Sequence, residues 1–148
     1  MFEPIGNVKS RATEKVDQHW GQVISEIIIK EELRDGLQGL EDFSHVIVVY
    51  HLSEAKFVKE NHLVRRPQGR ADMPKVGIFA QRAKDRPNTI GVTAVKLLSV
   101  KQNAITVQGL DAIDGTPVLD IKPYYPQYDL KENAHVPEWV NILMADYF

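Results

Sequence analysis

Two arginines on a stiff turn are the side chains of this sequence best suited to bind a charged ligand. Arg82 and Arg86 lie four residues apart within the segment Gly77–Gly91, and Arg86 stands directly before Pro87 and Asn88. Because Pro87 fixes φ and lacks a backbone donor, the chain must leave its sheet at this point. Most arginines are only surface charge, but a guanidinium held on such a turn is suited to bind a carboxylate or a phosphate. We also expect Asn88 and Gly91 to adopt the positive φ of a tight return.

A second segment, Asp111–Tyr124, gathers three aspartates, a lysine and a tyrosine within fourteen residues. Asp114 belongs to an Asp-Gly-Thr-Pro turn, so it either caps that turn or contributes a carboxylate to a site. Asp120 and Lys122 are two residues apart in a strand-like stretch and therefore share one face. They form either a salt bridge of little energetic weight or part of a polar pocket, in which carboxylates accept from ribose hydroxyls or an amino group.

Other kinds of chemistry have no motif behind them. His45 and His51 bracket an apolar run, and their spacing is not that of a zinc site, so we expect no metal. The sequence has no cysteine, which excludes disulfides, cysteine nucleophiles and thiolate metal ligands. It also lacks the serine-hydrolase elbow, the P-loop and the G-x-G-x-x-G dinucleotide pattern. No residue is assigned as catalytic.

Charge is distributed unevenly along the chain. The net charge is -2, which taken alone argues against a nucleic-acid partner. Residues 54–86, however, hold 9 Lys/Arg against 4 Asp/Glu, whereas residues 1–53 hold 5 against 9 and residues 87–148 hold 4 against 7. The basic stretch is either a solvated loop or a surface that faces phosphates, and composition does not decide between the two.

The chain has the size and composition of a globular domain. Its 148 residues are enough to bury a core, and 43% hydrophobic with 26% charged residues is typical of a soluble protein. The first residues lack a basic start followed by an apolar run, so we expect no signal peptide. The longest apolar stretch, 46–50, is too short to span a bilayer. We expect a cytoplasmic protein without a membrane partner.

Short apolar runs separated by turn residues predict a mostly β, single-domain fold. Strands about every ten residues favour a mostly antiparallel sheet curled towards a barrel over an α/β fold, which would need longer helices. The run 45–51 is continuously apolar and suits a strand buried on both faces. The expected strands are Ile24–Ile29, His45–His51, Val92–Val100, Ala104–Gln108 and Pro117–Lys122, the third and fourth forming a hairpin.

Helix is predicted only in short pieces. Pro137 and the spacing of Trp139, Ile142 and Leu143 predict a short helix near the C-terminus, packed on the domain or on a partner chain. One helical turn is expected within 37–43, after a turn at 35–39. The connection 53–75 is the least structured and most basic stretch, and connections of this length are usually functional or disordered.

Both segments that could carry chemistry resemble a known pattern. Gly77–Gly91 and Asp111–Tyr124 are similar, almost without interruption, to the two long motifs of the TsaA-like family, also called the TrmO family. Ile5–Ser10 and Gly39–His45 resemble two further pieces of that family, in the right order. The resemblance covers about residues 4 to 129, which we take as the core of one domain spanning 1–148, with 130–148 as a C-terminal tail.

The resemblance implies a β-barrel-like fold, usually a homodimer, that binds S-adenosyl-L-methionine. The family's activity methylates the exocyclic nitrogen of threonylcarbamoyladenosine, beside the anticodon of a tRNA. Carried over position by position, the expected cofactor-binding residues are Gln18, His51, Leu52, Arg82, Val92, Ala112, Ile113, Asp114 and Gly115. The expected substrate-binding residues are Phe79, Arg86, Asn88, Asp120, Lys122 and Tyr124.

The sequence departs from the family pattern at three places. Gln18 alone is retained from the family's Pro-Arg-Gln near the N-terminus, Leu52 stands where bacterial members often carry Gln, and Thr89 replaces a proline. Two alternatives stay open beside the methyltransferase. One is a non-catalytic protein that binds S-adenosyl-L-methionine on the same fold, and the other is an RNA-binding module with no cofactor.

Overall fold

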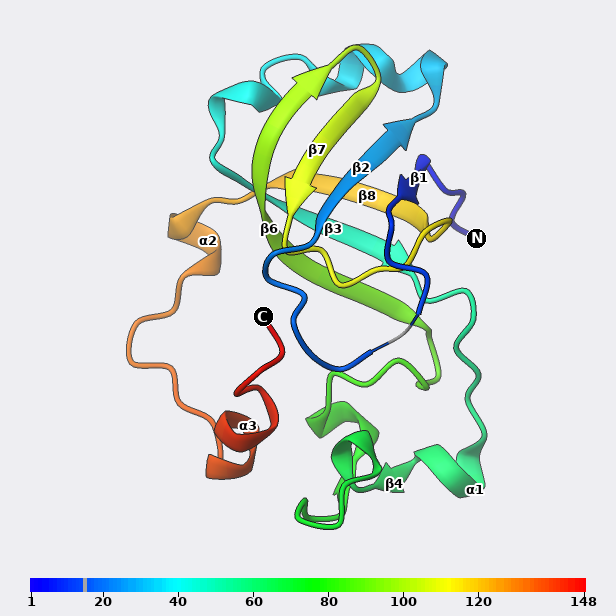
Figure 1. Cartoon of the computed structure of the whole chain (residues 1–148), viewed down its shortest axis with the longest axis vertical. Coiled ribbons are helices and arrows are strands. Elements are labelled where there is room, and N and C mark those ends of the chain that lie inside the picture. Colours follow the sequence, from blue (N-terminus) through cyan, green and yellow to red (C-terminus); the bar gives the residue numbers. More distant parts are fainter. Residues whose placement is uncertain (15) are drawn as a thin grey trace.

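The computed structural model describes residues 1–14 and 16–148. Within these residues, antiparallel strands close into a six-stranded barrel in the order β1-β2-β7-β6-β3-β8 (Figure 1). The barrel strands are β1 Gly6–Lys9, β2 Ile24–Ile29, β3 His45–His51, β6 Ile90–Lys101, β7 Ala104–Gln108 and β8 Pro117–Pro123. The expected mostly β class and the curled sheet are confirmed, and the curl goes to full closure.

Strand β3 shows how the barrel divides its residues between inside and outside. Val46, Val48 and Tyr50 point inward and are buried, whereas Ile47 and Val49 point outward and are only half-buried. The prediction of a strand buried on both faces is therefore wrong, because a barrel offers each strand one interior face. The interior is completed by the buried residues Val8, Ile27, Ile29, Leu37, Val95, Ile105, Val107, Leu110, Ala112 and Val118.

The predicted hairpin is confirmed in β6 and β7, but its two strands differ in length. Pairing of β6 with β7 begins at Lys96, opposite Gln108, whereas pairing of β6 with β3 runs down to Ile90. The lower half of β6, residues 90–95, therefore has no partner strand on its β7 side among the described residues. We call this unpaired edge of β6, together with the facing residues 109–112, the seam.

Two 3-10 helices cover the end of the barrel that carries the β6–β7 hairpin (Figure 1). They are η1, Glu31–Leu37, and η2, Leu40–Asp42. The turn predicted at 35–39 is wrong in its first half, which belongs to η1, and right at Gly39, whose φ is 88°. The helical turn expected within 37–43 is confirmed as η2.

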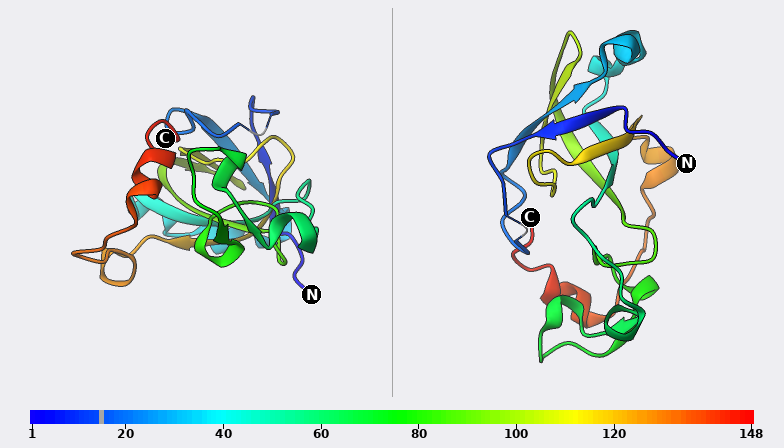
Figure 2. Two further views of the ribbon diagram at one scale, coloured as in Figure 1. Left: turned by 90° about the horizontal axis from the view of Figure 1, so that it is seen from below. Right: turned by 90° about the vertical axis from the view of Figure 1, so that its right-hand side faces the viewer.

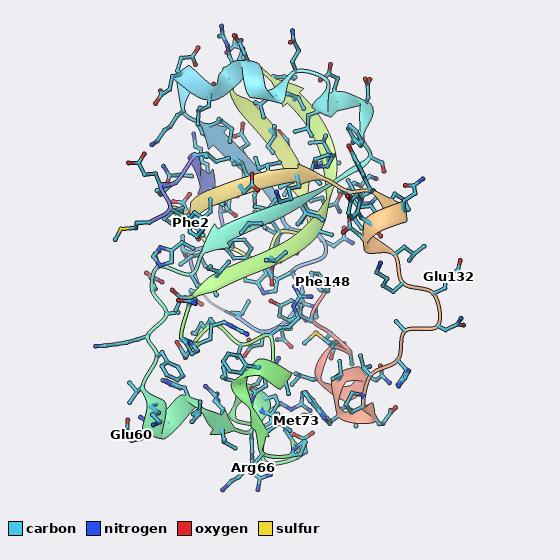
Figure 3. All side chains as sticks on the ribbon, turned by 180° about the vertical axis from the view of Figure 1, so that it is seen from behind. Phe2, Glu60, Arg66, Met73, Glu132 and Phe148 are labelled. Carbon is cyan, nitrogen blue, oxygen red and sulfur yellow. The ribbon has the colours of Figure 1, made fainter. Side chains whose placement is uncertain are left out.

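The basic stretch is more ordered than its composition predicts. It contains α1 Lys59–His62, β4 Val64–Arg65, η3 Pro67–Gly69, β5 Val76–Gly77 and η4 Ile78–Ala80, and β4 pairs with β5. Met73 and Ile78 are each 1% exposed, and the Gln81 side-chain amide donates to the carbonyls of Arg65 and Val76. We call residues 56–86 the lobe. Figure 3 shows Arg66 and Met73 in it, beneath the barrel.

The C-terminal part runs down beside the barrel and returns to it. It contains α2, Pro126–Asp129, and α3, Glu138–Leu143, which confirms the predicted helix. In Figure 2, α3 lies at the level of the lobe. Residues 144–148, which we call the tail, then reach the lower end of the barrel (Phe148 in Figure 3). There the amides of His19 and Trp20 donate to the carbonyls of Asp146 and Tyr147, each at 2.7 Å.

None of the helices in the described part of the chain is both long enough and apolar enough to cross a membrane.

Candidate binding site at the barrel seam

The seam presents backbone polar groups of β6. Thr89 accepts a hydrogen bond from the Leu52 amide at 2.8 Å, so odd-numbered residues of this strand turn their peptide groups towards β3. Since successive residues of a strand alternate, Val92 and Ala94 turn theirs towards the seam. The Val92 carbonyl confirms this direction, because it accepts from the guanidinium of Arg82. Arg82 therefore lies at the seam with its side chain exposed.

Beside the seam, three hydroxyl groups converge on one carboxylate. Thr93 Oγ1 donates to Asp111 Oδ1 at 2.5 Å, and the Tyr50 hydroxyl donates to the same oxygen at 2.9 Å. The hydroxyl of Tyr147, in the tail, donates to Asp111 Oδ2. We call Tyr50, Thr93, Asp111 and Tyr147 the hydroxyl cluster. It joins two barrel strands, the segment after β7 and the tail at one point.

Both tyrosines of the hydroxyl cluster are held in their protonated form. Burial, and next the negative charge of Asp111, raises the pKa of the Tyr50 hydroxyl well above its ordinary value. The same two causes raise the pKa of Tyr147. Near neutral pH both phenols are therefore hydrogen-bond donors, and neither is able to act as a general base.

Gly91 makes room for the hydroxyl cluster. A Cβ at this position would lie 2.5 Å from carbon atoms of the Tyr50 ring, so the ring and any larger residue exclude each other. Gly91 is a residue of β6 opposite Tyr50. Its φ is not positive, and neither is that of Asn88. The prediction of a positive-φ turn at these two residues is wrong, because the glycine is needed for space and not for backbone conformation.

The structure brings the predicted cofactor residues Arg82, Val92 and Ala112 to the seam, whereas His51 lies on β3, across the other edge of β6. His51, Val92 and Ala112 each adjoin a member of the hydroxyl cluster in the chain, and Arg82 binds the Val92 carbonyl. The side chains of His51 and Val92 are exposed, because they alternate with the inward-pointing Tyr50 and Thr93. Leu52 packs against the core. These residues come from β3, β6, the lobe and the chain after β7, which meet only in the folded barrel.

The predicted residues of the Asp-Gly-Thr-Pro turn have a clear structural task. Asp114 Oδ1 accepts from the Ser10 amide at 2.9 Å, and the Asp114 amide donates to the Ala12 carbonyl at 2.7 Å. Gly115 has a φ of 84°, and Ile113 is half-buried. Asp114 thus fixes the chain that leaves β1, and its side-chain hydrogen bond goes to Ser10 and not to its own turn. A cofactor contact of this turn stays a prediction.

Gln18 lies in the segment between β1 and β2. It is exposed and lines a hollow of about 280 Å³ together with Val16, Trp20 and neighbouring residues. Trp20 is 3% exposed and its indole donates to the Val16 carbonyl at 2.8 Å. The tail connects this hollow to the hydroxyl cluster, since it pairs with Trp20 and carries Tyr147.

Three predicted substrate residues lie in the lobe or directly after it. Phe79 is 79% exposed, and Asn88 is exposed as well. Arg86 is half-buried and donates to the carbonyls of Gln81 and Ala83 at 2.9 and 3.2 Å. Arg86 therefore braces its own turn, and this accounts for its position without a ligand.

The other three predicted substrate residues lie along β8 or just beyond it, away from the seam. Lys122 forms an ion pair with Asp120 at 2.8 Å, and both side chains are largely exposed, which is the salt-bridge alternative. Tyr124 lies beside His45, at the opposite end of β3 from His51, with ring centroids 6.1 Å apart. It lines a hollow of about 500 Å³ with Phe43, Ser44, His45, Tyr125, Pro126, Gln127 and Asp42.

The hydroxyl cluster is the part of the site that motif reasoning missed. Asp111 lies in a recognised segment, but Tyr50, Thr93 and Tyr147 come from three distant parts of the sequence and share no spacing. The seam as a whole fits S-adenosyl-L-methionine. Arg82 offers a cation for its carboxylate, and Val92 and Ala94 offer peptide groups at an open strand edge. Among residues 1–14 and 16–148 no group of three possible metal ligands is found, and the absence of a metal stays a prediction.

The fold is a small closed β-barrel in which Arg82 and the hydroxyl cluster lie beside the unpaired edge of β6. The sequence matches the family model of the tRNA-methyltransferase O N-terminal domain over residues 12–130, and the chain belongs to this family. It is similar to a crystal structure of TrmO from Pseudomonas aeruginosa, with a TM-score of 0.75 at 29% sequence identity. The match covers 93% of this chain and 60% of that one.

Three of the relatives have names that point either to the cofactor or to a tRNA. A probable S-adenosyl-L-methionine-binding protein of Pyrococcus abyssi is 43% identical over 105 residues, 71% of this chain and 54% of the relative. An S-adenosyl-L-methionine-binding protein of Archaeoglobus fulgidus is 38% identical over 133 residues, 87% of this chain and 92% of the relative. The tRNA (adenine(37)-N6)-methyltransferase of Mus musculus is 43% identical over 100 residues, 68% of this chain. This chain spans about half of the Pyrococcus relative and 23% of the mouse enzyme.

Proposed function

We propose that this chain binds S-adenosyl-L-methionine at the seam and transfers its methyl group to a tRNA. The proposed acceptor is the exocyclic nitrogen of threonylcarbamoyladenosine beside the anticodon. The observation that carries the proposal is Arg82 bound to the Val92 carbonyl at an unpaired strand edge, within a chain of the tRNA-methyltransferase O family. The names of the archaeal and mammalian relatives support the cofactor and the tRNA respectively.

The residues of the seam would act by holding the reactants. Arg82 would bind the carboxylate of the methionine part, and the peptide groups of Val92 and Ala94 would offer it hydrogen bonds along β6. The bound cofactor supplies an electrophilic methyl group, so the protein mainly has to align it with the nitrogen and keep water out. The raised pKa of Tyr50 and Tyr147 agrees with a site that uses no tyrosine base.

The lobe supports an RNA substrate. Lys75 and Lys84 are exposed in it, and Phe79 offers an aromatic face at 79% exposure. Phosphates bind basic side chains, and unstacked bases of single-stranded loops stack on aromatic ones. A base next to an anticodon lies in such a loop, so it is turned out at modest cost. The lobe lies beneath the same end of the barrel as the seam (Figure 1).

The test is methyl transfer to tRNA taken from cells that lack this protein. The purified chain is incubated with this tRNA and radiolabelled S-adenosyl-L-methionine, and the tRNA nucleosides are analysed by mass spectrometry. We expect label in the methylated form of threonylcarbamoyladenosine, and less of it with Arg82→Ala. The matched control is Arg34→Ala, which removes an arginine paired with Glu31 in η1.

Two outcomes would replace the proposal by one of its alternatives. Tight cofactor binding with no label in any tRNA would indicate a non-catalytic binding protein. A melting temperature that does not change when S-adenosyl-L-methionine is added would indicate an RNA-binding module. A ligand that binds only the folded state must raise the melting temperature. The homodimer and the cytoplasmic location stay predictions, and sedimentation of the purified chain tests the first.

A further inference from the structure

Asp111 forms no ion pair with a cationic side chain of the described residues. Its carboxylate accepts from Thr93, Tyr50 and Tyr147, which are all neutral hydroxyl donors. The ion pairs among the described residues join Arg34 to Glu31, His62 to Asp85, Arg70 to Asp72 and Lys122 to Asp120. The three hydroxyl donors stabilise this half-buried carboxylate, and its unpaired charge makes it suited to bind a positively charged ligand.

The hydroxyl cluster also places this charge next to Arg82. Arg82 binds the carbonyl of Val92, and the next residue of β6, Thr93, donates to Asp111. A cation and an anion, from the lobe and from the segment after β7, thus bind consecutive residues of β6. A ligand that carries both a carboxylate and a positive centre matches this pair, and S-adenosyl-L-methionine carries such centres in its ammonium and sulfonium groups.

The tail fixes the geometry of the carboxylate. Its backbone is hydrogen-bonded to His19 and Trp20, and a Cβ at Gly21 would lie 2.6 Å from the carbonyl carbon of Phe148. The tail is therefore closely fitted to this part of the barrel. Tyr147 projects from it to Asp111 Oδ2, whereas Tyr50 and Thr93 both donate to Oδ1. One carboxylate oxygen is thus bound by residues of the barrel strands and the other by a residue of the tail.

We infer that Asp111 is the counter-ion for the positive charge of the bound cofactor, and that Tyr147 is the positioning residue that orients its carboxylate. The inference rests on the proposed function in assuming that S-adenosyl-L-methionine binds at the seam. It assigns a binding role to a residue outside the expected cofactor set, and it makes the tail part of the site.

Calorimetric titration with three ligands tests the inference. S-adenosyl-L-methionine has the sulfonium and the ammonium, S-adenosyl-L-homocysteine has only the ammonium, and 5′-methylthioadenosine has neither. We expect Asp111→Asn to bind the first at least about tenfold more weakly. If Asp111→Asn loses affinity only for S-adenosyl-L-methionine, Asp111 faces the sulfonium. If it loses affinity equally for S-adenosyl-L-methionine and S-adenosyl-L-homocysteine, Asp111 faces the ammonium. Unchanged affinity, or an equal loss for all three, overturns the inference.

Further variants separate this role from a structural one. Asp111→Glu keeps the charge, so it should keep the ligand preference that Asp111→Asn loses, even where either variant is less stable. Tyr147→Phe should weaken the binding of the same ligands as Asp111→Asn does, but by a smaller factor of about two- to fivefold. The control Tyr128→Phe changes a tyrosine that is 74% exposed and should change no affinity. A Tyr147→Phe variant that binds all three ligands as the wild type does removes Tyr147 from the site.

The outcome for the wild type distinguishes this inference from the proposed function. A wild-type chain that binds none of the three ligands contradicts the proposed function, and the inference falls with it. A wild-type chain that binds the cofactor but methylates no tRNA contradicts the proposed activity and leaves Asp111 to be judged by its variants alone.

Discussion

Each tyrosine that donates to Asp111 keeps its proton in the folded chain at a pH where the unfolded chain loses it. The ordinary tyrosine pKa is 10.0, and burial with the Asp111 charge raises the pKa of both Tyr50 and Tyr147 above it. A raised pKa means that the stabilising contribution is complete below pH 10.0 and declines above it. The free energy of unfolding should therefore fall as the pH rises through this range.

Tyr147→Phe removes one of these two ionisations. Above about pH 10 its free energy of unfolding should fall less steeply than that of the wild type, by at most about 1.4 kcal/mol per pH unit. Urea unfolding at a series of alkaline pH values measures both slopes. Tyr128→Phe serves as the control and should follow the wild type. Parallel slopes for the wild type and Tyr147→Phe would contradict a raised pKa at Tyr147.

Arg82 is the residue on which the proposed cofactor contact depends most. Arg82→Ala removes a charge-assisted hydrogen bond to the carboxylate, so the binding free energy should weaken by about 1–3 kcal/mol. Calorimetry with S-adenosyl-L-methionine measures the change, and Arg34→Ala in η1 should leave the affinity as it is. An unaltered affinity in Arg82→Ala would place the cofactor elsewhere.

At the scale of single elements, the length difference between β6 and β7 creates the seam, and Gly91 keeps it usable. Gly91→Ala places a Cβ 2.5 Å from the Tyr50 ring, so the ring must move and the bonds of its hydroxyl to Thr93 and Asp111 break. We expect a loss of about 1–3 kcal/mol in the free energy of unfolding, measured with urea.

Gly36→Ala is the matched control for this substitution. Gly36 lies in η1, has nothing within 4 Å of its ideal Cβ position and does not have a positive φ. Alanine there should be neutral or slightly stabilising, because it restricts the unfolded chain. If Gly91→Ala and Gly36→Ala have equal free energies of unfolding, the Tyr50 ring moves aside without destabilising the fold.

Local pattern was enough to predict most strands, because alternation and turn residues act over a few positions. The bounds of β2 and the β6–β7 hairpin follow from this. The lobe escaped prediction, since its buried Met73 and Ile78 are isolated and show no period. The hydroxyl cluster escaped for another reason. Its members lie at positions 50, 93, 111 and 147, and only closure of the barrel and return of the tail bring them together.

At the scale of the whole molecule, positive charge is concentrated at one end. If the lobe binds RNA phosphates, Lys75→Ala combined with Lys84→Ala should reduce the slope of log affinity against log salt by up to about 0.7 per lysine. Filter binding with unmodified tRNA at several salt concentrations measures this slope. The control combines Lys30→Ala with Lys101→Ala, at the other end of the barrel, and should keep the wild-type slope. If the slope falls by the same amount in both double variants, the RNA does not bind preferentially to the lobe.

The seam divides the amide protons of β6 into two alternating sets. Those of Gly91 and Thr93 point to β3 within the sheet, whereas those of Val92 and Ala94 point to the open edge. The amide protons of residues 91–94 should therefore alternate between slow and fast exchange with deuterated water. A ligand seated along the seam would slow Val92 and Ala94 and leave their neighbours as they were. Four amides resolved by NMR would then report, residue by residue, whether the site is filled.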